Sequence, residues 1–157
     1  MKEKINLKVN GKEHSVEVDP STPLLYVLRN NLELNGPKYG CGLQQCGSCM
    51  VLLNGEATPS CRIPVSAMKD MEIVTLEGLQ KETGELHSVQ EAFYEEQAAQ
   101  CGFCLNGMVI STVALLEKNS NPDRGEILEG LERVLCRCGT HSRIIKAVET
   151  AGAKISR

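Results

Sequence analysis

The spacing of apolar and polar positions predicts a sheet in the first half of the chain. Residues 5–9 and 14–18 alternate with a period of two on either side of Asn10-Gly11, a dipeptide typical of a tight hairpin turn. Further along come a helix, a second hairpin and one more strand, predicted at residues 24–32, 50–61 and 72–76. Residues 1–76 are therefore expected to form a small mixed sheet that holds one helix.

From residue 77 onward the apolar residues recur three and four positions apart, which is typical of amphipathic helices. Ser88-Val89-Gln90-Glu91 has the pattern of a capping box, and Asp123 can cap another helix. Four helices are predicted, starting near Ser88, Leu105 and Asp123 and after Cys138, with the third running to Leu135. The chain is thus predicted to be α+β, with a sheet domain, a linker and a helical domain at residues 1–76, 77–87 and 88–157.

Composition limits the possible functions of this 157-residue chain, which is long enough to bury a core without covalent cross-links. The net charge is −3 with both signs mixed, and there are three Tyr, two Phe and no Trp, so a nucleic-acid partner is not expected. The first residues alternate charged and apolar side chains without the apolar core of a secretory signal. The most apolar run, residues 108–116, is too short to span a membrane, so we expect a cytoplasmic protein.

Eight cysteines are the feature that points to chemistry. They fall into a first group, Cys41, Cys46, Cys49 and Cys61, and a second group, Cys101, Cys104, Cys136 and Cys138. The even number keeps disulfides open as an alternative. Tight Cys-x-x-Cys and Cys-x-Cys spacings, however, suit metal ligands better than cross-links between distant loops. The sequence therefore predicts two metal centres.

The first group has the Cys-x4-Cys-x2-Cys spacing of plant-type 2Fe-2S ferredoxins. The Asn54-Gly55 hairpin returns the chain so that Cys61, after 11 intervening residues, comes back beside Cys49. This interval is much shorter than in ordinary plant-type ferredoxins. A zinc site is the competing interpretation, but zinc ligands usually come as two Cys-x2–4-Cys units, which fits a triplet plus a lone cysteine poorly.

The second group places a cysteine pair at the start of each of two predicted helices. Free backbone N–H groups and the positive end of the helix dipole stabilise thiolates there. The 31 residues between Cys104 and Cys136 allow one helix out, a turn at Asn121-Pro122 and one helix back. The four thiols of this group are therefore expected to converge on one centre.

The order of these motifs, ending in Gln-Cys-Gly-Phe-Cys and Leu-Cys-Arg-Cys-Gly, resembles the iron-sulfur subunit of the molybdenum hydroxylases. This family includes xanthine dehydrogenase, aldehyde oxidoreductase, carbon monoxide dehydrogenase and the dehydrogenases of nicotinate and isoquinoline. The resemblance covers nearly the whole chain. It implies a β-grasp ferredoxin-like domain followed by a helical domain, each with one 2Fe-2S cluster held by its four cysteines.

The same resemblance implies an electron-transfer role. The catalytic site would lie in a large partner subunit that binds molybdopterin, with Gln100 and Cys138 of this chain touching the pterin. Electrons would pass through the second cysteine group, then the first, and leave to a subunit that binds FAD or to a cytochrome. A zinc-stabilised adaptor and a free-standing ferredoxin without a molybdenum partner remain the alternatives.

Two short segments depart from the xanthine dehydrogenase pattern. Many members read Cys-Thr-Pro-Gly and Cys-Arg-Cys-Thr-Gly-Tyr, where this chain has Cys104-Leu105-Asn106-Gly107 and Cys138-Gly139-Thr140-His141. These segments look more like the small subunits of nicotinate dehydrogenase and isoquinoline oxidoreductase. The resemblance thus implies that the whole enzyme hydroxylates an N-heterocyclic aromatic compound, or else oxidises an aldehyde.

Overall fold

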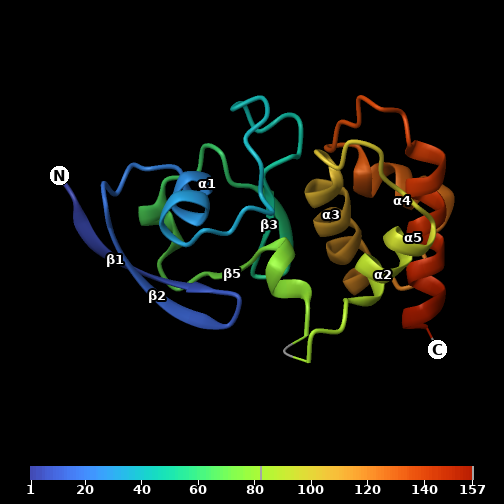
Figure 1. The fold of residues 1–157 in the computed structure, drawn as a ribbon, viewed down its shortest axis with the longest axis horizontal. Helices are drawn as coiled ribbons and strands as arrows, with labels where there is room; N and C mark the ends of the chain where they lie inside the picture. Colours follow the sequence, from blue (N-terminus) through green and yellow to red (C-terminus); the bar gives the residue numbers. More distant parts are fainter. Residues whose placement is uncertain (82, 157) are drawn as a thin grey trace.

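A five-stranded sheet and a group of helices lie side by side in the computed structural model, which describes residues 1–81 and 83–156 (Figure 1). The strands are β1 (Glu3–Val9), β2 (Lys12–Val18), β3 (Met50–Leu53), β4 (Glu56–Pro59) and β5 (Glu72–Val74). They lie in the order β2-β1-β5-β3-β4. The β1–β5 pair is parallel, and the other neighbouring strands are antiparallel.

Both predicted hairpins are confirmed, because each Asn-Gly pair takes the left-handed backbone that a tight turn needs. The φ angles are 52° and 73° at Asn10 and Gly11, and 48° and 85° at Asn54 and Gly55. The helix predicted after Pro23 begins as α1 (Leu24–Tyr26) and continues as a wider π-helical turn (Val27–Asn31). A short 3-10 helix (Val65–Met68) precedes β5.

Helices α2 (Ser88–Glu95), α3 (Leu105–Lys118), α4 (Arg124–Leu131) and α5 (His141–Ile155) form the second part of the chain. Helix α2 is capped by His87, one residue before Ser88, where the predicted capping box began. The imidazole Nδ1 of His87 accepts from the Val89 N–H at 3.2 Å, and the Gln90 side chain accepts from the His87 N–H at 3.0 Å. Asp123 caps α4 as predicted, accepting from the Glu126 N–H at 2.9 Å.

The predicted end of the third helix was wrong. Helix α4 ends at Leu131, and the Leu135 N–H donates to the carbonyl of Cys46 at 3.1 Å instead of continuing the helix. After Leu131 the chain turns, with the Val134 N–H donating to the Leu131 carbonyl, and Leu135 then pairs with the first half of the chain. The spacing of apolar residues in the sequence does not reveal such a contact.

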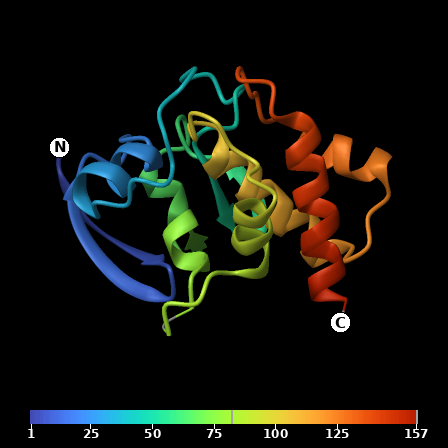
Figure 2. The same cartoon turned by 45° about the vertical axis from the view of Figure 1, so that its right-hand side comes forward.

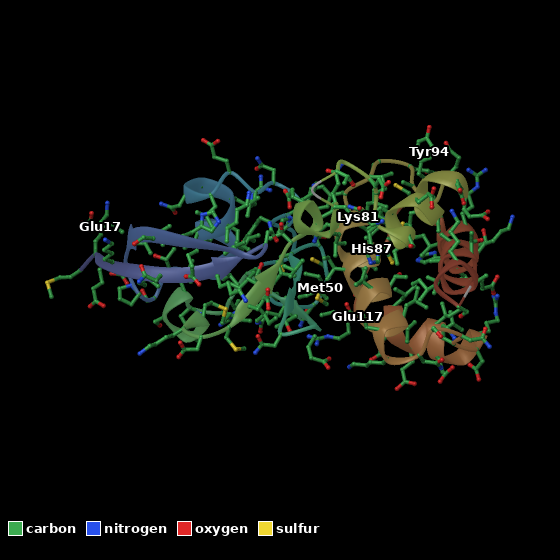
Figure 3. All side chains as sticks on the ribbon, turned by 90° about the horizontal axis from the view of Figure 1, so that it is seen from below. Glu17, Met50, Lys81, His87, Tyr94 and Glu117 are labelled. Carbon is green, nitrogen blue, oxygen red and sulfur yellow. The ribbon has the colours of Figure 1, made fainter. Side chains whose placement is uncertain are left out.

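Strand β3 is buried on both of its faces, which explains its continuous apolar sequence. Val51 and Leu53 pack into a core with α1, whereas Met50 and Leu52 belong to the core formed by α2 to α5. Met50 lies between the sheet and the helices (Figure 3). Helices therefore cover both faces of the sheet at β3, which contributes to both cores, whereas β1 and β2 bury residues on one face only.

A second 3-10 helix (Leu76–Leu79) lies between the sheet and α2, in the predicted linker. Residue 82 of that linker and residue 157 lie outside the described residues, and the proposed division at residues 76 and 88 stays a prediction. Among residues 1–81 and 83–156, no helix is long and apolar enough to cross a membrane.

Candidate metal centres

The cysteine-bearing loops lie along one edge of the molecule. The loop at residues 41–49, the loop that leads into α3 and the loop that leads into α5 are neighbours there in both views (Figures 1 and 2). The first of these loops comes from the sheet part and the other two come from the helical part. The fold thus brings both cysteine groups to one side of the protein.

Cys41 and Cys46 form the more exposed half of the first group. The N–H of Cys41 donates to the Cys46 sulfur at 3.4 Å, and the N–H groups of Leu43 and Gln45 donate to the Cys41 sulfur at 3.3 and 3.4 Å. Burial by itself raises the pKa of Cys41, but these N–H donors outweigh it and lower the pKa to about 7. The loop is therefore built to hold a thiolate at Cys41.

Cys49 and Cys61 form the buried half of the first group and pack together with Leu25. Ser60 fixes the return strand beside them, since its N–H and its hydroxyl both donate to the Cys49 carbonyl, at 3.1 and 2.7 Å. Burial raises the pKa of the Cys49 thiol to about 11, and the neighbouring Cys61 thiol adds to the rise. Cys61 thus returns beside Cys49, as the hairpin predicted.

The second group also consists of two pairs. The Cys101 thiol contacts the Cys138 thiol, and the Cys104 thiol contacts that of Cys136. Cys104 occupies the N-cap position of α3. Burial and the Cys136 thiol raise the pKa of Cys104 to about 12.

The other member of that pair, Cys136, is buried and has a strongly lowered pKa. Burial raises it, but the hydroxyl and N–H of Thr140 and the N–H of Gly139 overcome burial and lower the pKa of Cys136 to about 6. The Cys136 sulfur lies 3.4 Å from the Thr140 hydroxyl oxygen. Each cysteine group thus contains one thiol with a lowered pKa, Cys41 or Cys136, and one with a raised pKa, Cys49 or Cys104.

This arrangement in pairs fits a cluster of two irons better than a single ion. Each iron of a 2Fe-2S cluster takes two cysteine thiolates and shares bridging sulfides with the other iron. Backbone N–H groups aimed at sulfur, as at Cys41 and Cys136, suit the anionic ligands that such a cluster needs. Among the described residues, no three His, Cys, Asp or Glu side chains are placed around a single metal position.

The two cysteine groups touch through their backbones. The Cys46 carbonyl accepts from the Leu135 N–H, one residue before Cys136. Gly47, with φ of 72°, packs against the backbone of residues 133–134 and against Gly107, where a Cβ on either glycine would overlap main-chain atoms. No side chain larger than hydrogen fits at these two positions.

Asn106 lies at this contact between the two cysteine groups and was not predicted to be functional. Its side-chain N–H groups donate to the carbonyls of Ser48 at 3.0 Å and Met50 at 2.9 Å, and its side-chain oxygen is buried without a partner among the residues that the structure describes. The signal was present, because an amide in the apolar helix that starts at Leu105 needs internal hydrogen-bond partners. Asn106 ties the start of α3 to the Cys46–Cys49 segment.

Of the two residues expected to touch a pterin, Gln100 is exposed beside Cys101, and Cys138 is partly buried. His141 is exposed at the start of α5, and His14 lies far from the cysteines in sequence, on β2. The structure places Gln100 and Cys138 in the two loops that the Cys101–Cys138 contact joins. Their contact with a pterin stays a prediction.

The metal-free chain should react unequally with iodoacetamide at its first cysteine group. At pH 7 about half of Cys41 is thiolate, against roughly one in ten thousand of Cys49, given pKa values of about 7 and about 11. Peptide mass mapping should show Cys41 alkylated at least about 100-fold faster. Raising the pH from 7 to 8 should increase the Cys41 rate by less than about twofold but the Cys49 rate by about tenfold; equal rates or parallel pH profiles would contradict these pKa shifts.

Comparison with known proteins gives a consistent result over nearly the whole chain. Residues 7–75 match the family model of the 2Fe-2S iron-sulfur cluster binding domain, and residues 75–149 match that of a 2Fe-2S binding domain. The chain is 50% identical to one of the subunits of nicotinate dehydrogenase from Pseudomonas putida, over 96% of each protein. It is 42% identical to the alpha subunit of isoquinoline 1-oxidoreductase of Brevundimonas diminuta, over 94% of this chain and 96% of that one.

Among solved structures, the chain is similar to quinoline 2-oxidoreductase from Pseudomonas putida 86. The TM-score is 0.93 at 33% sequence identity, and the match covers 99% of this chain and 97% of the other. Both parts of the fold, the sheet and the helices, thus have counterparts in a protein with an experimentally determined structure.

Proposed function

The chain belongs to the iron-sulfur small subunits of the molybdenum hydroxylase family, and we propose that it carries electrons from a large molybdopterin-binding subunit to an acceptor. The observation that carries the proposal is the backbone contact between the two cysteine groups, where the Cys46 carbonyl accepts from the Leu135 N–H. Two electron-accepting centres held by loops that are hydrogen-bonded to one another, at one edge of a small protein, would form a route for single electrons. The substrate chemistry takes place in the partner.

We propose that each cysteine group supplies all four ligands of one 2Fe-2S cluster. The ligand sets are Cys41, Cys46, Cys49 and Cys61 for one cluster, and Cys101, Cys104, Cys136 and Cys138 for the other. Each cluster, when bound, accepts and releases one electron. The thiol pairs and the N–H groups directed at Cys41 and Cys136 support these assignments.

The protein residues around the second group suit contact with the large subunit. Cys101 and Gln100 are exposed, and two large apolar side chains next to ligands, Phe103 and Leu135, are 47% and 67% exposed. Exposed apolar residues at a functional edge are typical of a protein interface. We propose that the large subunit covers this edge and that Gln100 and Cys138 contact its pterin.

The acceptor and the substrate belong to the same proposal. Because relatives at 50% and 42% identity are named for nicotinate and isoquinoline, we propose that the complete enzyme hydroxylates an N-heterocyclic aromatic compound, with aldehyde oxidation as the second candidate. Electrons would leave the first cysteine group to an FAD-binding subunit or a cytochrome. We place the complex in the cytoplasm, as the sequence led us to expect.

Purification of the tagged chain from its natural host tests the proposal. We expect a large subunit that contains molybdenum to co-purify, together with about four irons and four sulfides per small subunit. A colourless chain with stoichiometric zinc would identify the zinc-stabilised adaptor. A red-brown chain with iron and sulfide but no molybdenum-containing partner would identify the free-standing ferredoxin.

A further inference from the structure

Each cysteine group contains one buried hydroxyl that lies next to a sulfur. The Ser48 hydroxyl oxygen is 3.6 Å from the Cys46 sulfur, and the Thr140 hydroxyl oxygen is 3.4 Å from the Cys136 sulfur. The two residues are only 4% and 6% exposed. Water therefore competes little with the sulfur for either hydroxyl.

Thr140 occupies the N-cap position of α5, where a threonine side chain normally stabilises the start of the helix. As the residue that caps α5, it would be expected to accept from an N–H of the first helical turn. Its side chain makes no such hydrogen bond, although its carbonyl accepts from the N–H groups of Arg143 and Ile144 at 3.1 Å each. The hydroxyl is turned toward Cys136 instead, so the contact with sulfur has replaced the usual cap.

At Ser48 the direction of the hydrogen bond depends on the state of Cys46. In the structure the Cys46 thiol donates to the Ser48 hydroxyl. A ligating thiolate has no proton, so the serine O–H must then donate to the sulfur. The Ser48 carbonyl is held by the Asn106 side chain at 3.0 Å, which fixes the backbone of the serine beside its sulfur.

We propose that Ser48 and Thr140 are tuning residues, each of which raises the reduction potential of the cluster held by its own cysteine group. This inference rests on the ligand sets proposed above. Reduction adds one electron and makes the ligand sulfurs more negative, and a hydrogen bond to sulfur stabilises the more negative state more strongly. Each hydroxyl acts through one ligand, so the two potentials are set independently of one another.

The test is a redox titration of the full chain with its clusters bound, followed by electron paramagnetic resonance. Ser48→Ala should lower only the potential of the first cluster, and Thr140→Val only that of the second. We expect about a tenfold change in the ratio of oxidised to reduced cluster, which is about 59 mV for one electron. Thr140→Ser keeps the hydroxyl and should restore the potential.

A buried hydroxyl that points to a carbonyl instead of a sulfur provides a matched control. Thr112 donates to the Met108 carbonyl. Thr112→Val should leave both potentials unchanged. Unchanged potentials in Ser48→Ala and Thr140→Val at full iron content, or equal shifts of both clusters in either variant, would overturn the inference alone. A wild-type chain that binds no iron would overturn it together with the proposed function.

Discussion

Replacing Cys138 by serine is expected to remove one of two clusters and to leave the other intact. A serine hydroxyl stays protonated at neutral pH and is a much poorer iron ligand than a thiolate. Cys138 contacts Cys101 in the second group, and the first group has contacts of its own, such as that of Cys49 with Cys61. Iron and sulfide should fall from about four to about two per chain, and one of the two electron paramagnetic resonance signals should disappear.

A serine variant in the first cysteine group provides the control for that experiment. Cys41→Ser should remove the other signal, since Cys41 belongs to the first group and contacts Cys46. Electron transfer from the partner should be lost in both variants, because either one interrupts the route. If both signals vanish together in either variant, the assignment of two independent sets of cysteine ligands is wrong.

Replacing Gly107 by alanine is expected to destabilise the whole chain. A Cβ at this position would overlap the carbonyl of Gly47 and press on the Val134 side chain, and the backbone oxygen cannot rotate away. Overpacking of this kind costs about 3 kcal/mol. Alanine regains about 1 kcal/mol of helix propensity in α3. The net loss of about 2 kcal/mol should lower the melting temperature by roughly 4–8 °C.

Gly125→Ala is a suitable control because Gly125 is an exposed helical glycine in α4. Among the described residues outside the adjacent helix backbone, the one close neighbour of an added Cβ there is the Asp123 carboxylate, at 3.1 Å, a side chain that can shift. Calorimetry should show a melting temperature equal to or slightly above that of the original chain. Equal melting temperatures for Gly107→Ala and the original chain would show that the two cysteine loops are not tightly packed on one another.

Local sequence signals predicted much of the fold. The Asn10-Gly11 and Asn54-Gly55 turns were predictable because a two-residue hairpin needs left-handed backbone, which this pair adopts easily. The helices were evident from the spacing of their apolar residues. The start of α4 was evident because Asp123 has a side chain that can cap a helix. Cysteine spacing alone pointed to the two metal centres, and the family comparison agrees with them.

Features that depend on contacts between the two halves could not be predicted. Helix α4 stops at Leu131, and beyond it Leu135 pairs with Cys46, which is distant in sequence. Asn106 was noticed only as a departure from a family pattern, and its two carbonyl partners became visible only in three dimensions. The hydroxyls of Ser48 and Thr140 carry no sequence signal, because serine and threonine are common in loops. The assignment of individual ligands stays a prediction.

Strand β3 gives the chain a property that its two-part sequence does not suggest. Its odd and even residues belong to different hydrophobic cores, so the strand cannot leave one core without disturbing the other. A fragment that ended near residue 76 would expose Met50 and Leu52 to water and would tend to aggregate. Although the sequence looks like two modules in tandem, the chain should unfold in a single cooperative transition.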